Sequence, residues 1–253
     1  MKQLTKSQKH AIIIMSTTIL MAILIFISVN YVNDFYRATT TAQKAMLGNA
    51  KVEVTEEEEY YLFAPKPSKE ETTERVEKGI VFYPGGKVEE TAYAPMLLRF
   101  AENGYEVYLV KMPAKLAVFG INAAENIIEH TSHIKEWMMM GHSLGGAMAA
   151  TFSASHEEEV DVLVLLAAYS TSDLTDLDME VYTIYGSEDR VLNMEKYEKY
   201  ETNLPEDAME MVIDGGNHAN YAHYGEQEGD VSATITREEQ QECELDFLLS
   251  NAR

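Results

Sequence analysis

The sequence is poor in several residue types, with one cysteine, one tryptophan and six prolines among 253 residues. Cys243 therefore has no partner for a disulfide within the chain, and metal sites built from several cysteines are excluded. Basic residues are also few: 20 lysines and arginines against 42 acidic residues give a net charge of -22 at pH 7. A surface of this sign repels phosphate backbones, so nucleic acid is not expected as a partner. Stability must come from a packed core, for which 46% apolar residues suffice.

The longest apolar run covers residues 11–32 and contains no charged side chain. As a helix it would span a hydrocarbon layer of about 30 Å. Three lysines precede it, while one acidic and one basic residue follow it closely. The positive-inside rule then predicts a single-pass membrane protein with residues 1–10 in the cytoplasm and the rest outside it. A cleaved signal peptide is the alternative, but this run is long and no good cleavage site follows, so we favour an uncleaved anchor.

Residues 33–78 are mostly polar and are expected to form a juxtamembrane linker. Within them, Tyr60 to Pro65 has the composition of a strand and predicts a possible edge strand. The acidic run from Glu56 to Glu59 is interpreted as a solvated face, and residues 64–74 as a connector rich in charge and proline.

From residue 79 to the C-terminus, apolar strands alternate with amphipathic helices. This rhythm predicts an α/β domain over residues 79–253, with a doubly wound, mostly parallel sheet and helices on both faces. Thr236 and Glu239 predict a capping box at the start of the last helix. The expected strands are 79–83, 105–112, 134–140, 160–168, 179–186 and 209–216; the expected helices are 90–104, 121–130, 144–156, 193–201 and a final one from 236.

One junction carries the strongest chemical signal. Three methionines, 138–140, end an expected strand, and Gly141-His142-Ser143-Leu144-Gly145 follows before a helix of small residues. The pattern G-x-S-x-G between a strand and a helix is typical of a nucleophile elbow, in which a strained turn lifts the serine above the sheet. Ser143 is thus predicted to be a nucleophile at the carboxyl ends of the strands.

A serine hydroxyl needs a base and an acid that orients the base. After Ser143, Asp189 follows one expected strand and His218 follows the next, which would bring both to the same edge of the sheet. We predict Asp189 as the acid and His218 as the base. Rival acids are Glu188 and three aspartates in the preceding loop, namely Asp173, Asp176 and Asp178.

An oxyanion hole requires two backbone donors. The N–H of Leu144, directly after the nucleophile, is the first. The loop Pro84-Gly85-Gly86 after the first strand supplies the second, with Gly86 preferred and Lys87 as the alternative. Among the other histidines, His142 is predicted to pack or hydrogen-bond, and His223 to line the site; His130 and His133 are expected to face solvent, and His10 precedes the anchor.

With these motifs, the chain from about residue 78 onward resembles the α/β-hydrolase family. The segment around His218 and the stretch "VKMPAKLAVFG" are similar to a compact carboxylesterase-like branch related to dienelactone hydrolases, here with a serine nucleophile. Only residues 169–179 join the sixth and seventh strands, so no lid domain is expected. Residues 219–234 and 113–121 are expected to wall an open site suited to accessible or polymeric esters.

The resemblance implies a serine hydrolase that cleaves carboxylic esters through an acyl-enzyme, with neither a cofactor nor a metal. An acyltransferase or a peptidase would use the same triad, and a silent binding module could use the same fold. The expected partners are an ester substrate and the membrane.

Overall fold

The computed structural model describes residues 5–67 and 76–252. It divides into an N-terminal unit that ends at Phe35 and a compact domain that begins at Tyr36. The first four residues of the predicted cytoplasmic segment, and residues 68–75 of the predicted connector, lie outside the described residues.

The N-terminal unit consists of α1, Lys6–Asn33, which extends a few residues beyond the predicted run 11–32 at its N-terminal end. Thr5 and Gln8 form a capping box at its start. Its polar side chains bond back to the helix, as Thr18 Oγ1 does to the Ile14 carbonyl and Asn30 Nδ2 to the Phe26 carbonyl. With a mean hydropathy of 2.7 and exposed side chains, α1 is long and apolar enough to cross a membrane.

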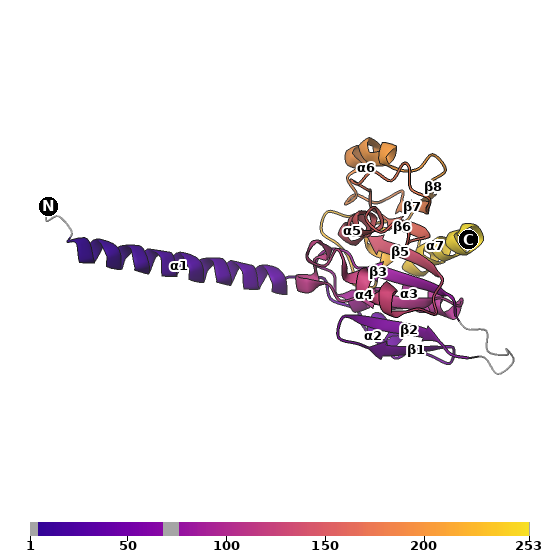
Figure 1. Ribbon diagram of the computed structural model, residues 1–253, viewed down its shortest axis with the longest axis horizontal. Coiled ribbons are helices and arrows are strands. Elements are labelled where there is room, and N and C mark those ends of the chain that lie inside the picture. The colour runs from indigo at the N-terminus through magenta and orange to yellow at the C-terminus, as the bar shows by residue number, and fades with distance from the viewer. Residues whose placement is uncertain (1–4, 68–75, 253) are drawn as a thin grey trace. The chain divides into compact units, whose positions relative to one another are not determined.

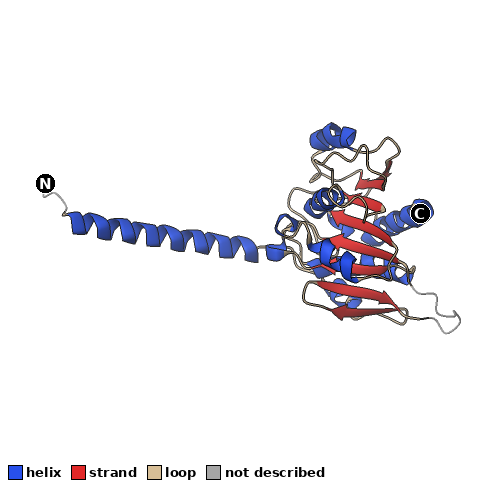
Figure 2. Cartoon of the chain, in the orientation of Figure 1, coloured by secondary structure: helices blue, strands red, loops and turns tan. Residues whose placement is uncertain are grey.

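The domain is built on one sheet of eight strands in the order β1-β2-β4-β3-β5-β6-β7-β8. The six strands from β4 to β8 in this order are parallel, while β2 pairs antiparallel with both β1 and β4. Figures 1 and 2 show this sheet between layers of helix. The strands are β1 (Val52–Glu56), β2 (Tyr60–Pro65), β3 (Lys78–Tyr83), β4 (Glu106–Val110), β5 (Glu136–His142), β6 (Val162–Leu166), β7 (Glu180–Gly186) and β8 (Met209–Ile213).

The predicted α/β fold is thereby confirmed, but the boundary of the domain differs from the prediction. Residues 36–67 are not a linker, because they form α2, β1 and β2 within the domain. The segment Tyr60–Pro65 is a strand but not the edge, since β1 covers its outer side. In β1 only Val52 is buried among acidic neighbours, so its sequence shows no apolar alternation.

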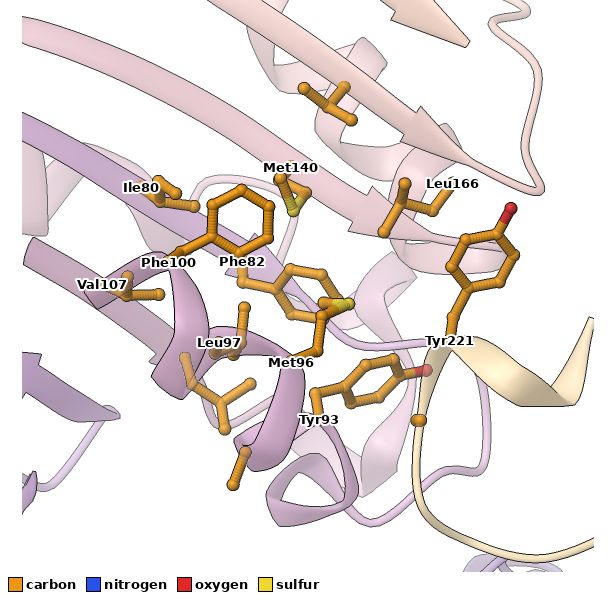
Figure 3. Close-up of a cluster of buried hydrophobic side chains, with 14 of the residues drawn as sticks. Ile80, Phe82, Tyr93, Met96, Leu97, Phe100, Val107, Met140, Leu166 and Tyr221 are labelled. Carbon is orange, nitrogen blue, oxygen red and sulfur yellow. The ribbon is translucent and has the colours of Figure 1, made fainter. Parts of the chain in front are cut away.

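Helices cover both faces of the sheet (Figure 2). The core on one face includes buried residues of α2, α3 and α7; the core on the other includes those of α4 and α5. The methionines of β5 pack into both cores. Met138 and Met140 lie in the first core and Met139 in the second, because successive side chains of a strand point to opposite faces of the sheet. Figure 3 shows Met140 with Phe82 and Leu166 of neighbouring strands opposite Met96 and Phe100 of α3.

The helices follow the predicted order, with shorter ends. The predicted helix 90–104 begins as a 3-10 turn, η1 (Glu90–Tyr93), and the α-helix α3 follows, with Pro95 in its first turn, where proline is favoured. Thr236 and Glu239 form the predicted capping box of α7. The helices are α2 (Thr40–Ala45), α3 (Ala94–Glu102), α4 (Ala123–His130), α5 (Leu144–Ser153), α6 (Met194–Tyr200) and α7 (Arg237–Asn251), with 3-10 turns η2 (Pro113–Lys115), η3 (Ala117–Phe119), η4 (Glu201–Asn203) and η5 (Ala219–Tyr221).

Candidate active site

Ser143 lies at the turn between β5 and α5, with φ 53° and ψ −121°. An L-residue in this region of φ/ψ space is strained, so the surrounding structure must hold it there. The Ser143 N–H donates to the Leu166 carbonyl of β6 at 2.9 Å, and the Ala147 N–H donates to the Ser143 carbonyl at 3.1 Å. The turn thus places Ser143 at the head of α5, where the carboxyl ends of the parallel strands meet.

Three glycines make this turn sterically feasible. A Cβ on Gly145 would lie 2.1 Å from the Tyr83 carbonyl oxygen, and one on Gly141 would lie 2.6 Å from the backbone of Gly145. A Cβ on Gly146 would meet the Ala168 side chain at 2.6 Å. Because the obstacles at the first two positions are backbone atoms, no rotamer change would relieve them, and α5 can approach β5 this closely only with glycine there.

Asp189 and His218 come together in the loops after β7 and β8. His218 Nδ1 lies 2.7 Å from Asp189 Oδ2, and both side chains are buried. The other carboxylate oxygen, Asp189 Oδ1, accepts the Val191 and Leu192 N–H groups at 2.8 Å each, which fixes the carboxylate. With Nδ1 engaged by the carboxylate, His218 Nε2 is the ring nitrogen left, and it has no hydrogen-bond partner among the described residues.

The rival acids lie elsewhere. Glu188 pairs with Arg190 at 3.2 Å, and Asp173 is exposed and accepts hydrogen bonds from Thr175. Asp189 is therefore the carboxylate that the structure brings to His218. The remaining candidates, Asp176 and Asp178, lie in the same exposed turn region before β7.

Two backbone amides near Ser143 are left without partners in the described structure. In the loop after β3, the Gly85 N–H donates to Tyr93 Oη at 2.9 Å and the Lys87 N–H donates to the Lys115 carbonyl at 2.8 Å. Between them, the Gly86 N–H makes no hydrogen bond. The Leu144 N–H opens the first turn of α5, where helix amides have no helical acceptor. Gly86 lies against the Leu144 side chain: a Cβ at position 86 would lie 3.0 Å from Leu144 Cδ2.

His142 is buried beside the pair rather than exposed to solvent. Its ring centroid lies 4.5 Å from that of His218, and its Nδ1 lies 2.8 Å from Tyr93 Oη. Burial, and secondarily the neighbouring His218, hold the pKa of His142 well below its ordinary value, so the ring is neutral. Tyr93 thus joins the loop of Gly85 to His142; it was not identified from the sequence, where it reads as one more buried aromatic of a helix.

A cavity of about 260 Å³ opens at Ser143 and His218. Its walls come from residues 167–169 after β6 and 191–193 after β7, together with Leu144 and Ala147. The predicted walls, 219–234 and 113–121, do not line it: Tyr221 and His223 are buried in the domain instead. The loop between β6 and β7 contains neither helix nor strand. His130 is exposed, while His133 is half-buried against Glu106 rather than facing solvent freely.

Comparison with known proteins gives the fold a family. Residues 79–242 match the sequence profile of the alpha/beta hydrolase family. The chain belongs to this family. No curated protein matches the sequence.

Solved structures of this family superpose on most of the chain. A predicted CIB-like hydrolase from Thermoplasma acidophilum covers 79% of this chain and 97% of its own, with a TM-score of 0.55 and 17% identity. The hydrolase MGS-MChE2, from a lagoon-sediment metagenome of Mar Chica, Morocco, covers 79% and 99% with a TM-score of 0.57 and 16% identity. Esterase 2 of Thermogutta terrifontis, in a form phosphoramylated by tabun, covers 80% and 96% with a TM-score of 0.57 and 13% identity.

At 13–17% identity, these likenesses show that the chain shares the fold of these hydrolases and esterases. Within the described residues, no group of three or more His, Cys, Asp or Glu side chains could hold a metal ion.

Proposed function

We propose that this protein is a serine hydrolase that cleaves carboxylic esters, with Ser143 as nucleophile, His218 as base and Asp189 as the acid that orients it. The observation that carries the proposal is the arrangement of His218: Nδ1 is held by a fixed carboxylate, while Nε2 is unpartnered and the ring shares a cavity with the strained Ser143. His142 Nε2 is buried without a partner as well, but His142 Nδ1 contacts a tyrosine hydroxyl, whereas His218 Nδ1 is held by a carboxylate.

In the proposed reaction, His218 Nε2 takes the Ser143 hydroxyl proton as the oxygen attacks the ester carbon. The negative charge that develops on the ester oxygen is stabilised by the Gly86 and Leu144 N–H groups, the two amides left free near Ser143. His218 then protonates the leaving alcohol, and an acyl-serine forms. Water, deprotonated by His218, attacks the acyl-serine; His218 then returns the proton to Ser143 Oγ as the bond to the acyl carbon breaks and the carboxylic acid leaves.

Hydrogen bonding in the oxyanion loop favours one of the two candidate donors over the other. Lys87 was the alternative to Gly86, but its N–H already bonds the Lys115 carbonyl. Donation to a second acceptor would require that bond to break, which costs free energy at each turnover. Gly86 therefore remains the proposed donor.

Labelling by a fluorophosphonate probe tests the proposal, since a solved esterase of this fold reacts with an organophosphorus compound. The full chain in detergent should be labelled, and Ser143→Ala should abolish labelling. His218→Ala and Asp189→Asn should each slow it by about 100-fold or more. Glu188→Gln and Asp173→Asn are matched controls that remove a neighbouring carboxylate and should label at the wild-type rate. A folded wild-type chain that resists labelling would refute the proposal.

The proposal includes the location of the enzyme. We infer that α1 anchors the chain and that the domain lies outside the cytoplasm, as the lysines before the apolar run 11–32 indicate. Leu249→Cys in a Cys243→Ser background places one thiol on an exposed position of α7. A membrane-impermeant maleimide should label it in intact cells as fully as after lysis. Labelling only after lysis would place the domain in the cytoplasm.

A further inference from the structure

The segment that follows α1 is built into the candidate active site. Tyr36 pairs with Val88 as a short parallel bridge: its N–H donates to the Lys87 carbonyl at 2.8 Å, and the Glu89 N–H donates to its carbonyl at 2.8 Å. Both bonds involve residues that follow Gly86 within three positions. The first residue of the domain is therefore hydrogen-bonded to the loop that carries the proposed oxyanion donor.

The same segment also contacts the loop that follows His218. The Tyr36 ring lies 5.2 Å from that of Tyr224, and Tyr36 Oη accepts the Glu228 N–H at 3.1 Å. The Thr39 N–H donates to the His223 carbonyl at 2.8 Å. Residues 36–39 thus join the oxyanion loop to the loop of the catalytic base, at the carboxyl edge of the sheet.

Chain length fixes how far this edge can be from the end of α1. Only Asp34 and Phe35 separate Asn33, the last residue of the helix, from Tyr36. Three residues of extended chain reach about 10 Å at most. The residue that is bonded to the loop of Gly86 is therefore tethered to the end of α1 by a very short piece of chain.

An exposed apolar turn lies beside the same loop. Val118 and Phe119 of η3 are 41% and 65% exposed. The Lys115 carbonyl accepts the Lys87 N–H, and Leu116 lies against Gly86, so this turn is held to the oxyanion loop. The pair gives the side of the oxyanion loop two exposed apolar side chains.

The three segments around Gly86 differ in charge from the whole chain. Segments 34–39, 84–90 and 113–121 together carry three acidic and three basic residues, a net charge of zero, whereas residues 219–234 at the same edge add three acidic residues and no basic one. In the three segments, the acidic residues are Asp34, Glu89 and Glu90; the basic ones are Arg37, Lys87 and Lys115. The three segments around Gly86 therefore add no net repulsion from anionic headgroups.

We propose that the rim around the active site lies on the membrane that holds α1, with Val118 and Phe119 in its interfacial layer, and that the substrate is an ester of a membrane lipid. This inference rests on the proposed function and on the anchor. A cavity of about 260 Å³ at Ser143 takes the ester and a short part of an acyl chain. The bilayer below would keep the rest of the lipid in an apolar environment, for which the domain needs no lid.

Depth-dependent quenching tests the orientation. In a Cys243→Ser background, a bimane fluorophore is placed at Val118→Cys or at Met209→Cys, and the full chain is reconstituted in phosphatidylcholine–phosphatidylglycerol nanodiscs. Met209 is the matched control because it is 39% exposed and lies at the amino end of β8. Lipids with a doxyl group near the headgroup should quench the probe at 118 by at least about threefold more than the probe at 209. Equal quenching at the two positions would overturn the orientation.

A matched pair of substrates tests the lipid ester. The nanodisc-bound chain is assayed with 4-methylumbelliferyl palmitate, which partitions into the bilayer, and with the water-soluble acetate. The ratio of palmitate to acetate turnover should fall by about threefold or more in Phe119→Ser, because its apolar area no longer enters the interface. An unchanged ratio would overturn the proposed substrate class. Fluorophosphonate labelling of Ser143 in the same samples separates the proposed hydrolase from the proposed orientation. If the wild-type chain is not labelled, the hydrolase is refuted, whereas the quenching experiment still reports whether residue 118 lies at the membrane.

Discussion

The two sides of the candidate site are held by different kinds of constraint. At the nucleophile elbow, residues 141–146, backbone packs on backbone, and the glycines that allow this lie within three residues of Ser143. The oxyanion loop, residues 84–88, is instead held by hydrogen bonds to Tyr93 Oη and the Lys115 carbonyl, which accept from it, and by the Tyr36 N–H, which donates to it. Local sterics thus set the conformation of the nucleophile, whereas distant segments set the position of the amide that would face it.

Gly145→Ala disturbs the close backbone packing at the nucleophile elbow and should have the largest effect on stability. Its methyl group would overlap the Tyr83 and Pro84 carbonyl oxygens, so α5 must move away from β5. We expect a loss of about 3 kcal/mol or more in the free energy of unfolding, measured by urea denaturation of the full chain in detergent.

Gly225→Ala is the control for that loss. Unlike Gly145, Gly225 carries a positive φ, of 95°, and a Cβ at this position would meet nothing within 4 Å. Only backbone strain would be added, at about 1 kcal/mol. If the two substitutions cost the same, close packing would not be what the elbow requires of Gly145.

Tyr93→Phe removes a hydroxyl that holds the oxyanion loop, and it should affect catalysis more than folding. It removes the acceptor of the Gly85 N–H and the partner of His142 Nδ1, both buried. We expect a loss of about 2 kcal/mol in stability and a fall of about tenfold or more in kcat, with little change in KM, because the adjacent Gly86 N–H loses its position.

Tyr83→Phe is the matched control for Tyr93. The Tyr83 hydroxyl is also engaged twice, since it accepts the Ala124 N–H and donates to the Ile121 carbonyl, but these bonds hold α4 and not the oxyanion loop. Its stability should fall by a similar amount while kcat changes by less than about threefold. Equal losses of kcat in both variants would show that Tyr93 has only a structural role.

The same contrast explains how far the sequence alone could lead. The elbow could be predicted from Gly141 to Gly145 because its steric constraints lie within one short motif. The placement of Asp189 and His218 after successive strands followed from the alternation of strands and helices. The hydrogen bonds at Gly85 and Lys87 could not be read, since their acceptors belong to Tyr93 and Lys115. Nothing in the local pattern of either residue indicates where its oxygen points.

Residues 36–67 were misassigned as a linker for a related reason. Their polar composition is that of an exposed segment, but α2 and β2 each bury a small apolar contribution against α3, as Ala42 and Phe63 show. The cavity walls were also wrongly placed. Loop length suggested residues 219–234, whereas packing buries Tyr221 of this loop against His142, at 5.2 Å between ring centroids.

His142 lies between the two sides and gives the smallest predicted effect, a dependence of stability on pH. It faces His218, Tyr93 and Tyr221, and burial holds its pKa below about 6.5, the value expected in the unfolded chain. Above this pH the ring is neutral in both states. As the pH falls below it, the unfolded chain binds a proton that the folded chain does not, so stability decreases by up to about 1.4 kcal/mol per pH unit.

His142→Gln should therefore flatten the loss of stability between pH 6.5 and pH 5, measured by urea denaturation at intervals of half a pH unit. The flattening is expected to be partial, because burial also lowers the pKa of His223 and leaves a second group with the same sign. His130→Gln, at an exposed position of α4, is the control and should keep the wild-type slope. A His142→Gln slope equal to that of the wild type would mean that the folded chain protonates His142 as readily as the unfolded chain does. The ring could then not remain a neutral acceptor for the Tyr93 hydroxyl at acidic pH, and the link from His142 to the oxyanion loop would weaken there.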